Sequence, residues 1–408
     1  MNSPGHFPVE LADRCVKCGL CLPYCPTYGL AGVEGESPRG RISLMQGLAT
    51  GQLEPGAMLV EHLESCLGCR ACEPVCPANV PYGELIDAGR ALLVERGVRP
   101  PAARRMLGGL LRRPRLLARL ARLARLPGAP ALAGMLGGLP ARAASLLPTT
   151  ARPPQWAATP TDAPAVAPAE GAPTRGEALL FAGCVGAAID GRTLDDTRRV
   201  LAAAGWRVRM PRDQGCCGAI DLHAGRPAAA QALASRNLAA FPGSGPVVPC
   251  ASGCAATLLE YARLAGADGA RFASRIKDPA ELLAEAELPL GPGAYPNVVL
   301  HVPCTQRNVT GTAAATRRLL ARIPGITLRE LPAGCCGAAG ETFITHPAMA
   351  DALLAPLLAA LSKDPPSALV TSNIGCAMHF AAGLKRAGLA VPVLHPASVL
   401  ASAVEYKA

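Results

Sequence analysis

Aromatic residues are scarce in this 408-residue sequence, at 3% of the total. Proteins that bind single-stranded nucleic acid stack bases on aromatic side chains, so this scarcity argues against a nucleic-acid partner despite a formal net charge of +10. The chain also lacks the uncharged apolar run of about 18 residues that a membrane-spanning helix needs. Its most Leu-rich stretch, 106–126, is interrupted by Arg and Pro.

Signals for export and for nucleotide binding are missing as well. Residues 1–14 contain neither a basic start nor an apolar core, so they do not resemble a secretory signal. Neither G-x-G-x-x-G nor G-x-x-x-x-G-K-[ST] occurs, so the sequence lacks two common motifs that bind dinucleotides and phosphates. We therefore expect a cytoplasmic protein, and peripheral attachment to the cytoplasmic face of the inner membrane stays open.

Cysteine, in contrast, is abundant, with 17 residues. Disulfides are rare in proteins that are not exported, so metal binding or redox chemistry is the expected role of these thiols. The length allows two to four domains. Composition divides the chain into a cysteine-rich N-terminal domain, an Arg/Leu-rich helical segment, a Pro/Ala-rich linker and two further cysteine-containing domains, at 1–100, 101–147, 148–176, 177–290 and 291–408.

Two N-terminal runs share the pattern C-x2-C-x2-C-x3-C-P, which binds [4Fe–4S] clusters in bacterial ferredoxins. The first run contains Cys15, Cys18, Cys21 and Cys25, and the second contains Cys66, Cys69, Cys72 and Cys76. In paired runs the fourth cysteine ligates the other cluster. The predicted ligand sets are therefore Cys15, Cys18, Cys21 and Cys76 for one cluster, and Cys66, Cys69, Cys72 and Cys25 for the other. Zinc is the alternative, but it explains neither the third cysteine of each run nor the matched prolines.

The C-terminal half is an internal duplication. Cys184, Cys216–Cys217 and Cys254 recur as Cys304, Cys335–Cys336 and Cys376, at offsets of 120, 119 and 122 residues. Short apolar runs predict strands at 178–182, 206–210, 246–249, 297–302, 326–331 and 368–371. Longer Ala- and Leu-rich segments predict helices at 195–204, 228–240, 313–323 and 348–361. This alternation predicts an α/β fold with a parallel sheet in each repeat, after a mainly helical ferredoxin-type domain, and thus a multidomain α+β protein.

The repeated cysteines all follow predicted strands. Ligands of open α/β sheets bind outside the carboxyl ends of the strands, so we expect four thiols to gather at one edge of each repeat. Such thiols can ligate metal or perform thiol–disulfide exchange, and small buried residues in a tight turn are the plainer alternative. Cys250 has no repeat counterpart, because Ser372 occupies the equivalent position. It is either a fifth ligand or an ordinary buried thiol.

Other polar residues allow more than one interpretation each. His223, His301, His346 and His379 lie near the cysteine turns and either tune a cluster or belong to the core. Arg39 and Arg41 lie between the two runs and either moderate cluster charge, contact a partner or belong to a solvated turn before a helix. Arg112, Arg115, Arg119 and Arg122 recur at helical spacing beside Leu116, Leu120 and Leu123. This pattern suits docking on an anionic membrane or acidic partner, or a helix that packs its leucines on its own domain.

The whole layout resembles the glycolate oxidase (glycolate dehydrogenase) iron–sulfur subunits. The resemblance rests on residues 15–28 and 35–42, the Gly-Cys-Cys-Gly turns at 215–218 and 334–337, Ala-Ser-Gly-Cys at 251–254 and Asn-Ile-Gly-Cys at 373–376. Heterodisulfide reductase and the iron–sulfur subunit of anaerobic glycerol-3-phosphate dehydrogenase share the Cys-Cys-Gly repeat. In heterodisulfide reductase the repeats carry unusual iron–sulfur clusters. The resemblance implies further clusters here, on Cys184, Cys216, Cys217 and Cys254, and on Cys304, Cys335, Cys336 and Cys376. The fullest motif has a fifth cysteine in each repeat, from which this chain departs.

The resemblance implies an electron-transfer subunit. FAD-containing dehydrogenase subunits would oxidise glycolate to glyoxylate, and this chain would relay electrons to a quinone or membrane electron acceptor, with no catalytic residue of its own. Alternatives are a thiol/disulfide redox enzyme like heterodisulfide reductase, the iron–sulfur subunit of a lactate or glycerol-3-phosphate dehydrogenase, and a module in which metal only staples the fold.

Overall fold

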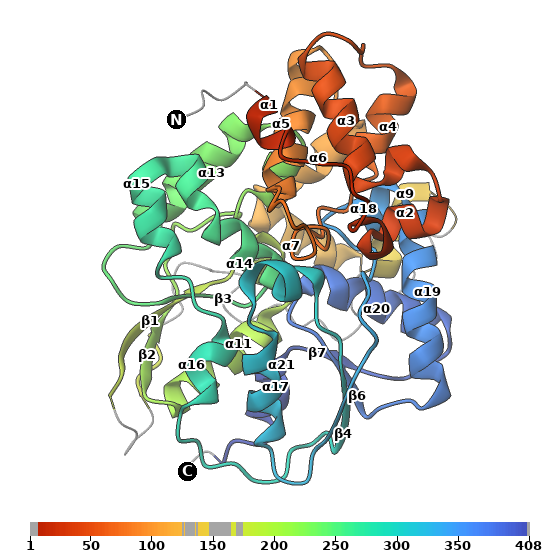
Figure 1. Cartoon of the computed structure of the whole chain (residues 1–408). Coiled ribbons are helices and arrows are strands. Elements are labelled where there is room, and N and C mark those ends of the chain that lie inside the picture. The colour runs from red at the N-terminus through yellow and green to blue at the C-terminus, as the bar shows by residue number, and fades with distance from the viewer. Residues whose placement is uncertain are drawn as a thin grey trace.

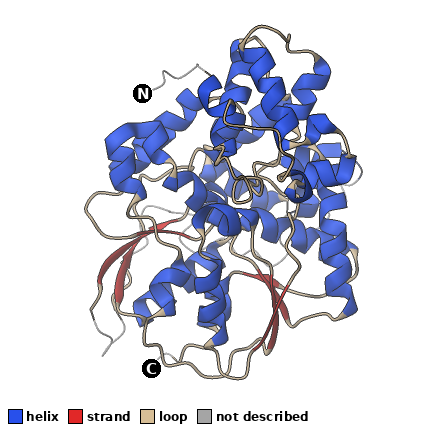
Figure 2. Cartoon of the chain, viewed as in Figure 1, coloured by secondary structure: helices blue, strands red, loops and turns tan. Residues whose placement is uncertain are grey.

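The computed structural model describes residues 7–124, 126, 135, 138–146, 165–168 and 174–405. A helical N-terminal region lies above two separate parallel sheets, each formed by one repeat (Figure 1). Figure 2 shows the strands as two small groups within a largely helical protein. The predicted fold class, a helical domain followed by two α/β repeats, is confirmed.

Short helices and loops make up the N-terminal region. Their bounds are α1 (Val9–Ala12), η1 (Leu22–Tyr24), α2 (Pro26–Ala31), η2 (Glu34–Glu36), α3 (Pro38–Ala49), α4 (Ala57–Glu64) and α5 (Tyr82–Glu95). Helix α3 begins where the Ser37 hydroxyl accepts a hydrogen bond of 2.9 Å from the Gly40 amide, a typical N-cap. Met45, Leu48, Leu63 and Leu85 are fully buried between α3, α4 and α5 and hold the region together.

The first repeat has the sheet order β2-β1-β3, with all pairs parallel. Its elements are β1 (Gly176–Phe181), α10 (Cys184–Ile189), α11 (Gly191–Ala203), β2 (Trp206–Arg209), α12 (Ala219–His223), α13 (Pro227–Ala240), β3 (Val247–Pro249), α14 (Ser252–Leu259), α15 (Tyr261–Ala273) and α16 (Pro279–Ala284). The three predicted strands and both predicted helices of this repeat are confirmed within a few residues.

The second repeat has the order β5-β4-β6-β7, again entirely parallel. Its elements are β4 (Asn297–Leu300), the π-helix η3 (Gln306–Thr310), α17 (Ala313–Ala321), β5 (Thr327–Glu330), α18 (Thr342–Thr345), α19 (Pro347–Lys363), β6 (Ala368–Val370), α20 (Ile374–Arg386), β7 (Val393–Leu394) and α21 (Pro396–Ala401). The three predicted strands are again confirmed. The sequence did not predict β7, because two residues are too few to show a strand period.

The two repeats share one apolar core. Helices α11 and α16 of the first repeat pack against α17 and α21 of the second, between the two sheets (Figure 1). Val200 and Leu201 on one side and Leu319 and Leu400 on the other are almost completely buried in this core. Burial of each such side chain stabilises the fold by about 1.5–3 kcal/mol, so the repeats are held firmly against each other.

Along the chain, three helices follow the N-terminal region and precede the first repeat. They are α6 (Ala102–Leu111), α7 (Pro114–Leu123) and α9 (Gly138–Leu146). Of the predicted linker, 148–176, the structure describes 165–168 and 174–176; the rest lies outside the described residues. Val166 pairs there with Val208 of β2 in an isolated antiparallel bridge. None of the helices that the structure describes is both long and apolar enough to cross a membrane.

Candidate iron–sulfur sites

The cysteines of the two N-terminal runs surround two separate cavities. One cavity is lined by Cys15, Cys18 and Cys21 of the first run together with Cys76 of the second. The other is lined by Cys66, Cys69 and Cys72 of the second run together with Cys25 of the first. The structure thus groups the eight thiols in the same two sets of four that the sequence pattern predicts, with the fourth cysteine of each run exchanged.

Both runs follow the same backbone path. Residues on either side of the middle cysteine have a positive φ, at 56° and 87° for Lys17 and Gly19, and at 59° and 57° for Gly68 and Arg70. A non-glycine residue in this region costs about 1–2 kcal/mol, so Lys17 and Arg70 hold a strained turn that the site requires. The strain brings three thiols of one short run to the wall of one cavity.

A single metal ion does not suit this arrangement. Zinc ligands must all converge at about 2.0–2.3 Å from one point. In the described part of the chain no three His, Cys, Asp or Glu side chains are arranged around a common point that could hold one metal ion. All 17 cysteines are free thiols, so none of the eight is used in a disulfide. Four thiols around a cavity fit a polynuclear cluster better than they fit zinc.

Burial shapes the protonation of these thiols. Burial raises the pKa of Cys69 and Cys72 well above its usual range, and it raises the pKa of Cys21 to a smaller extent. Without a metal these thiols therefore keep their protons. Iron must displace those protons on binding, because the thiolate is the ligand, so cluster assembly releases protons from this buried site.

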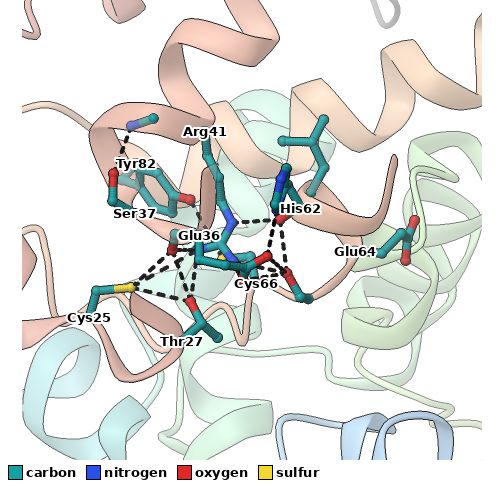
Figure 3. A network of polar contacts seen from close by, with 12 residues as sticks. Cys25, Thr27, Glu36, Ser37, Arg41, His62, Glu64, Cys66 and Tyr82 are labelled. Atoms are coloured by element: carbon teal, nitrogen blue, oxygen red, sulfur yellow. Dashed lines mark hydrogen bonds and ion pairs between the residues drawn. The ribbon is translucent and has the colours of Figure 1, made fainter. Parts of the chain in front are cut away.

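A buried ionic network ties the two runs together (Figure 3). The Arg41 side chain, 1% exposed, donates to Glu36 Oε2 at 2.5 Å, to Thr27 Oγ1 at 3.0 Å and to the His62 carbonyl at 2.6 Å. Its guanidinium also reaches to 4.0 Å from Cys25 Sγ. Arg41 therefore places a positive charge beside one predicted ligand of the second cavity, and it is not part of a solvated turn.

Arg39 lies beside the other cavity. Its guanidinium donates to the Lys17 carbonyl at 2.9 Å and to Glu34 Oε1 at 2.7 Å, and its side chain lines the first cavity. Arg39 and Arg41, two residues apart in α3, thus line one cavity each. The sequence placed both arginines between the cysteine runs, but spacing could not show that one would be buried and the other half-exposed.

In the first repeat the four predicted thiols gather at the carboxyl edge of the sheet. Cys184 Sγ lies 3.6 Å from Cys216 Sγ, and a hydrogen bond with Cys216 raises the pKa of Cys184 while it lowers that of Cys216. A hydrogen bond with Cys216 and another with Cys254 raise the pKa of Cys217. The turn needs Gly218, which has a φ of 93° and donates its amide to Cys216 Sγ at 3.5 Å.

The second repeat gathers its four thiols in the same way. Cys336 Sγ lies 2.9 Å from Cys376 Sγ, and their hydrogen bond lowers the pKa of Cys336 and raises that of Cys376. A hydrogen bond between Cys304 and Cys335 lowers the pKa of Cys304 and raises that of Cys335. At Gly337, with a φ of 78°, a Cβ would lie 2.5 Å from the Ala350 carbonyl oxygen, so no other residue fits without movement of the backbone.

Different side chains hold the two Cys-Cys-Gly turns. In the first repeat Asn237 Nδ2 donates to the Cys216 carbonyl at 2.9 Å, and the Tyr261 hydroxyl donates to the Cys217 carbonyl at 2.9 Å. In the second, His379 Nδ1 lies 2.7 Å from the Cys336 carbonyl oxygen and Nε2 lies 3.0 Å from Asp351 Oδ1. The first turn is therefore held by neutral groups and the second by an ionisable pair.

The other histidines and Cys250 contact different partners. His223 pairs with Asp87 at 2.8 Å, His301 Nδ1 lies 3.1 Å from Thr371 Oγ1, and His346 Nδ1 lies 3.0 Å from Thr345 Oγ1. The Cys250 thiol donates to Thr197 Oγ1 at 3.5 Å, and burial raises its pKa to about 12. Of the four histidines that the sequence suggested, His379 is hydrogen-bonded to the predicted ligand residue Cys336, and His301 interacts electrostatically with the same residue.

The second run lies where the N-terminal region meets both repeats. Asn308, in the π-helix η3 of the second repeat, donates to the Cys69 carbonyl at 2.7 Å. Arg70, the next residue, forms an ion pair with Glu260 of the first repeat. Cys69 is also close enough to Cys304 for the two charges to interact. The cavity of the second run is therefore adjacent to the thiols of the second repeat.

Comparison with known proteins identifies the modules. A 4Fe-4S dicluster domain matches residues 11–80, and a Cysteine-rich domain matches residues 178–259 and again 298–381. The probable glycolate oxidase iron-sulfur subunit of Bacillus subtilis is 33% identical over 97% of this chain and 94% of the relative. The chain belongs to the glycolate oxidase iron–sulfur subunit family.

The chain is also similar to a second glycolate oxidase subunit and, more distantly, to a heterodisulfide reductase subunit. The glycolate oxidase iron-sulfur subunit of Escherichia coli is 33% identical over 91% of the chain and 90% of the relative. One subunit of the dihydromethanophenazine:CoB–CoM heterodisulfide reductase of Methanosarcina barkeri is 24% identical over 84% of the chain and 81% of the relative. Membership of the glycolate oxidase family and the dicluster match establish iron–sulfur clusters as the cofactors, and the thiol sets described above fit them.

Proposed function

We propose that this chain is the electron-transfer subunit of a complex that oxidises glycolate to glyoxylate. FAD-containing partner subunits would perform the oxidation, and this chain would pass the electrons to a quinone or another membrane acceptor. The observation that carries the proposal is the contact of Asn308 with the Cys69 carbonyl, because it joins the second ferredoxin-type cavity to the second repeat. Electrons could then move through the chain without crossing solvent.

The ligand assignment is part of the proposal. Two [4Fe–4S] clusters would be held by Cys15, Cys18, Cys21 and Cys76, and by Cys66, Cys69, Cys72 and Cys25. Further clusters would be held by Cys184, Cys216, Cys217 and Cys254, and by Cys304, Cys335, Cys336 and Cys376. The grouping around two cavities and the two thiol gatherings support these sets. The corresponding domains would span 1–100, 177–290 and 291–408, joined by 101–147 and 148–176.

The test uses the chain purified without oxygen, alone and with its flavoprotein subunits. We expect glycolate to reduce the iron–sulfur EPR signals of this chain only when the flavoprotein is present, because the flavoprotein would perform the oxidation of the substrate. Lactate and glycerol 3-phosphate serve as competing substrates. Signals that never respond to glycolate, or rapid disulfide reduction by the isolated chain, would contradict the proposal and favour the alternatives.

Helix α7 supports a membrane as the site of the acceptor. Its small residues Ala118 and Ala121 are buried against α10, whereas Leu116, Leu120 and Leu123 are 40–57% exposed. The exposed leucines alternate with exposed arginines, Arg115, Arg119 and Arg122. The helix therefore does not pack this leucine stripe on its own domain. An apolar stripe among arginines suits the surface of an anionic membrane.

Charge reversal of α7 tests this surface. We expect a variant with Arg115→Glu, Arg119→Glu and Arg122→Glu to bind vesicles that contain anionic lipid at least tenfold more weakly, because each cation near such a surface contributes about 1 kcal/mol. Vesicle flotation measures the binding. A matched control reverses three exposed cations elsewhere, Arg207, Arg318 and Lys363, with the same change in net charge. Equal loss of binding in both variants would show that α7 is not the docking surface.

A further inference from the structure

A cavity of about 540 Å³ lies between the two repeats. The first repeat contributes Asp190, between α10 and α11, and Cys250, after β3. The second contributes residues at the carboxyl ends of β6 and β7 and along α20. Its described lining contains none of the sixteen predicted ligand cysteines. Its volume falls within the range of about 300–1,000 Å³ that is usual for small-molecule sites.

One part of the cavity wall is polar. Asp190 Oδ1 accepts a hydrogen bond of 2.8 Å from Thr193, and the His395 ring is hydrogen-bonded to the backbone of Cys250. Asp190 and Cys250 interact electrostatically, so these residues form one group rather than scattered contacts. The Thr193 hydroxyl already donates to Asp190, and the His395 ring accepts from the Ala397 amide and bonds the Cys250 backbone, so the protonated Asp190 carboxyl group is the donor for a carbonyl oxygen of a ligand.

This polar group carries little charge near neutral pH. Burial raises the pKa of Asp190 to about 7 and lowers the pKa of His395 to about 4. The imidazole is thus neutral, and the carboxyl group is protonated in a large fraction of molecules. The groups that face Asp190 are Thr193 and Asp196 of α11 and the Cys250 thiol, with the guanidinium of Arg192 nearby. A neutral ligand with carbonyl oxygens suits this wall better than a carboxylate does.

Much of the remaining lining is apolar, although Asn373 and Lys385 also contribute to it. Ala377, Ala381 and Leu384 recur at i, i+4 and i+7 on one face of α20, and Val391 and Val393 lie beside them in the lining. A ligand in the cavity therefore meets both hydrogen-bonding groups and aliphatic surface. Such a lining fits a flat ring with an apolar substituent.

The cavity lies beside both proposed redox sites and beside α7. Cys250 precedes the predicted ligand Cys254 by four residues, and Asn373, also in the lining, precedes Cys376 by three. Ile189, a third lining residue, packs against Ala118 and Ala121 of α7. A ligand that arrives from a membrane bound to α7 would thus reach a cavity between the two thiol gatherings.

We propose that this cavity binds a quinone, with a ring carbonyl at Asp190 and the apolar substituent along α20. The inference rests on the proposed function, which supplies the electrons. Reduction of the quinone to the quinol takes two electrons, delivered one at a time through the clusters of the repeats, and two protons, which come from water. The Asp190 carboxyl group delivers one of these protons to a ring oxygen and regains it from solvent.

The experiment uses the complete complex, with glycolate as donor and a short-chain ubiquinone as acceptor. Ala381→Trp fills the cavity from α20, and Ala359→Trp places the same side chain on the exposed face of α19 as a control. We expect Ala381→Trp to lower quinone reduction at least tenfold, while reduction of a hydrophilic dye and the cluster EPR spectra stay unchanged. Photolabelling with an azidoquinone reports binding directly, and we expect labels on α20 or at 388–395.

The outcomes separate the two proposals. If the wild-type complex reduces quinone and Ala381→Trp does so equally well, or the label appears elsewhere, the cavity assignment is wrong and the electron-transfer function stands. If the wild-type complex reduces the dye but not the quinone, the acceptor in the proposed function is wrong, and the cavity assignment fails with it. If Ala381→Trp loses the EPR spectra, Ala377→Phe and photolabelling of the wild type replace it as the test. Absence of label from the cavity then overturns the assignment.

Discussion

Substitution of Cys25 by alanine is expected to remove the cluster of the second run, not that of its own run. Cys25 lines the cavity of Cys66, Cys69 and Cys72, and it does not line the cavity of Cys15. A [4Fe–4S] cluster that lacks one thiolate loses stability, so the variant should lose about four iron atoms per chain. Iron analysis and EPR spectroscopy of the chain purified without oxygen measure this loss.

Double variants show which cluster has gone. Adding Cys66→Ala to Cys25→Ala should remove no further iron, because both residues line one cavity, whereas adding Cys15→Ala should remove about four more atoms. Cys76→Ala provides the reciprocal case. Adding Cys15→Ala to it should remove no further iron, whereas adding Cys66→Ala should remove about four more atoms. If Cys25→Ala combined with Cys15→Ala loses no more iron than Cys25→Ala alone, each run holds its own cluster and the crossed assignment is wrong.

Neutralisation of Glu36 is expected to destabilise the N-terminal region by about 3–5 kcal/mol. The Glu36→Gln change keeps the shape of the side chain but leaves the Arg41 guanidinium, 1% exposed, without its carboxylate partner. Removal of one member of a buried ion pair costs this much because the remaining charge is uncompensated. The same carboxylate accepts from Ser65 at 2.8 Å and contacts His62 at 2.7 Å, so the path from α3 to the second run weakens as well.

Loss of cluster absorbance with increasing denaturant measures this effect. Glu34→Gln is the matched control, since it lies in the same short helix and pairs with Arg39, but its side chain is 53% exposed. A solvent-exposed pair contributes about 0–1 kcal/mol, so the control should unfold almost like the wild type. Similar denaturation midpoints for Glu36→Gln and Glu34→Gln would mean that the Arg41 network does not stabilise the second run.

The sequence predicted the elements that repeat and the thiols that they carry. Six strands could be located because apolar runs such as 178–182 and 297–302 stand between clear helical segments, and both copies showed the same order. The grouping of thiols at the carboxyl edges followed from the parallel topology alone. Cysteine spacing likewise predicted that Cys25 and Cys76 would each join the other run, as the cavity linings show.

Contacts between distant segments could not be predicted in this way. Nothing in the spacing of 35–42 indicates that Arg41 will be buried against Glu36 and Cys25, because this depends on how α4 packs on α3. The sequence likewise could not show whether the leucines of α7 pack on their own domain or remain exposed, because alanines and leucines both recur at helical spacing there. It is the smaller Ala118 and Ala121 that face α10. The cavity between the repeats arises from their mutual arrangement, which no local pattern encodes.

The π-helix η3 makes the two copies of an ancient duplication unequal. After its first cysteine, the first copy continues into the regular helix α10, which packs on α7. The second copy forms a π-helix at the corresponding place, and this wider turn carries Asn308 to the Cys69 carbonyl. The second copy therefore places its π-helix against the second run, and the first packs α10 against α7. The two copies thus share one cysteine pattern and one sheet topology but differ in the surfaces that their first cysteines adjoin.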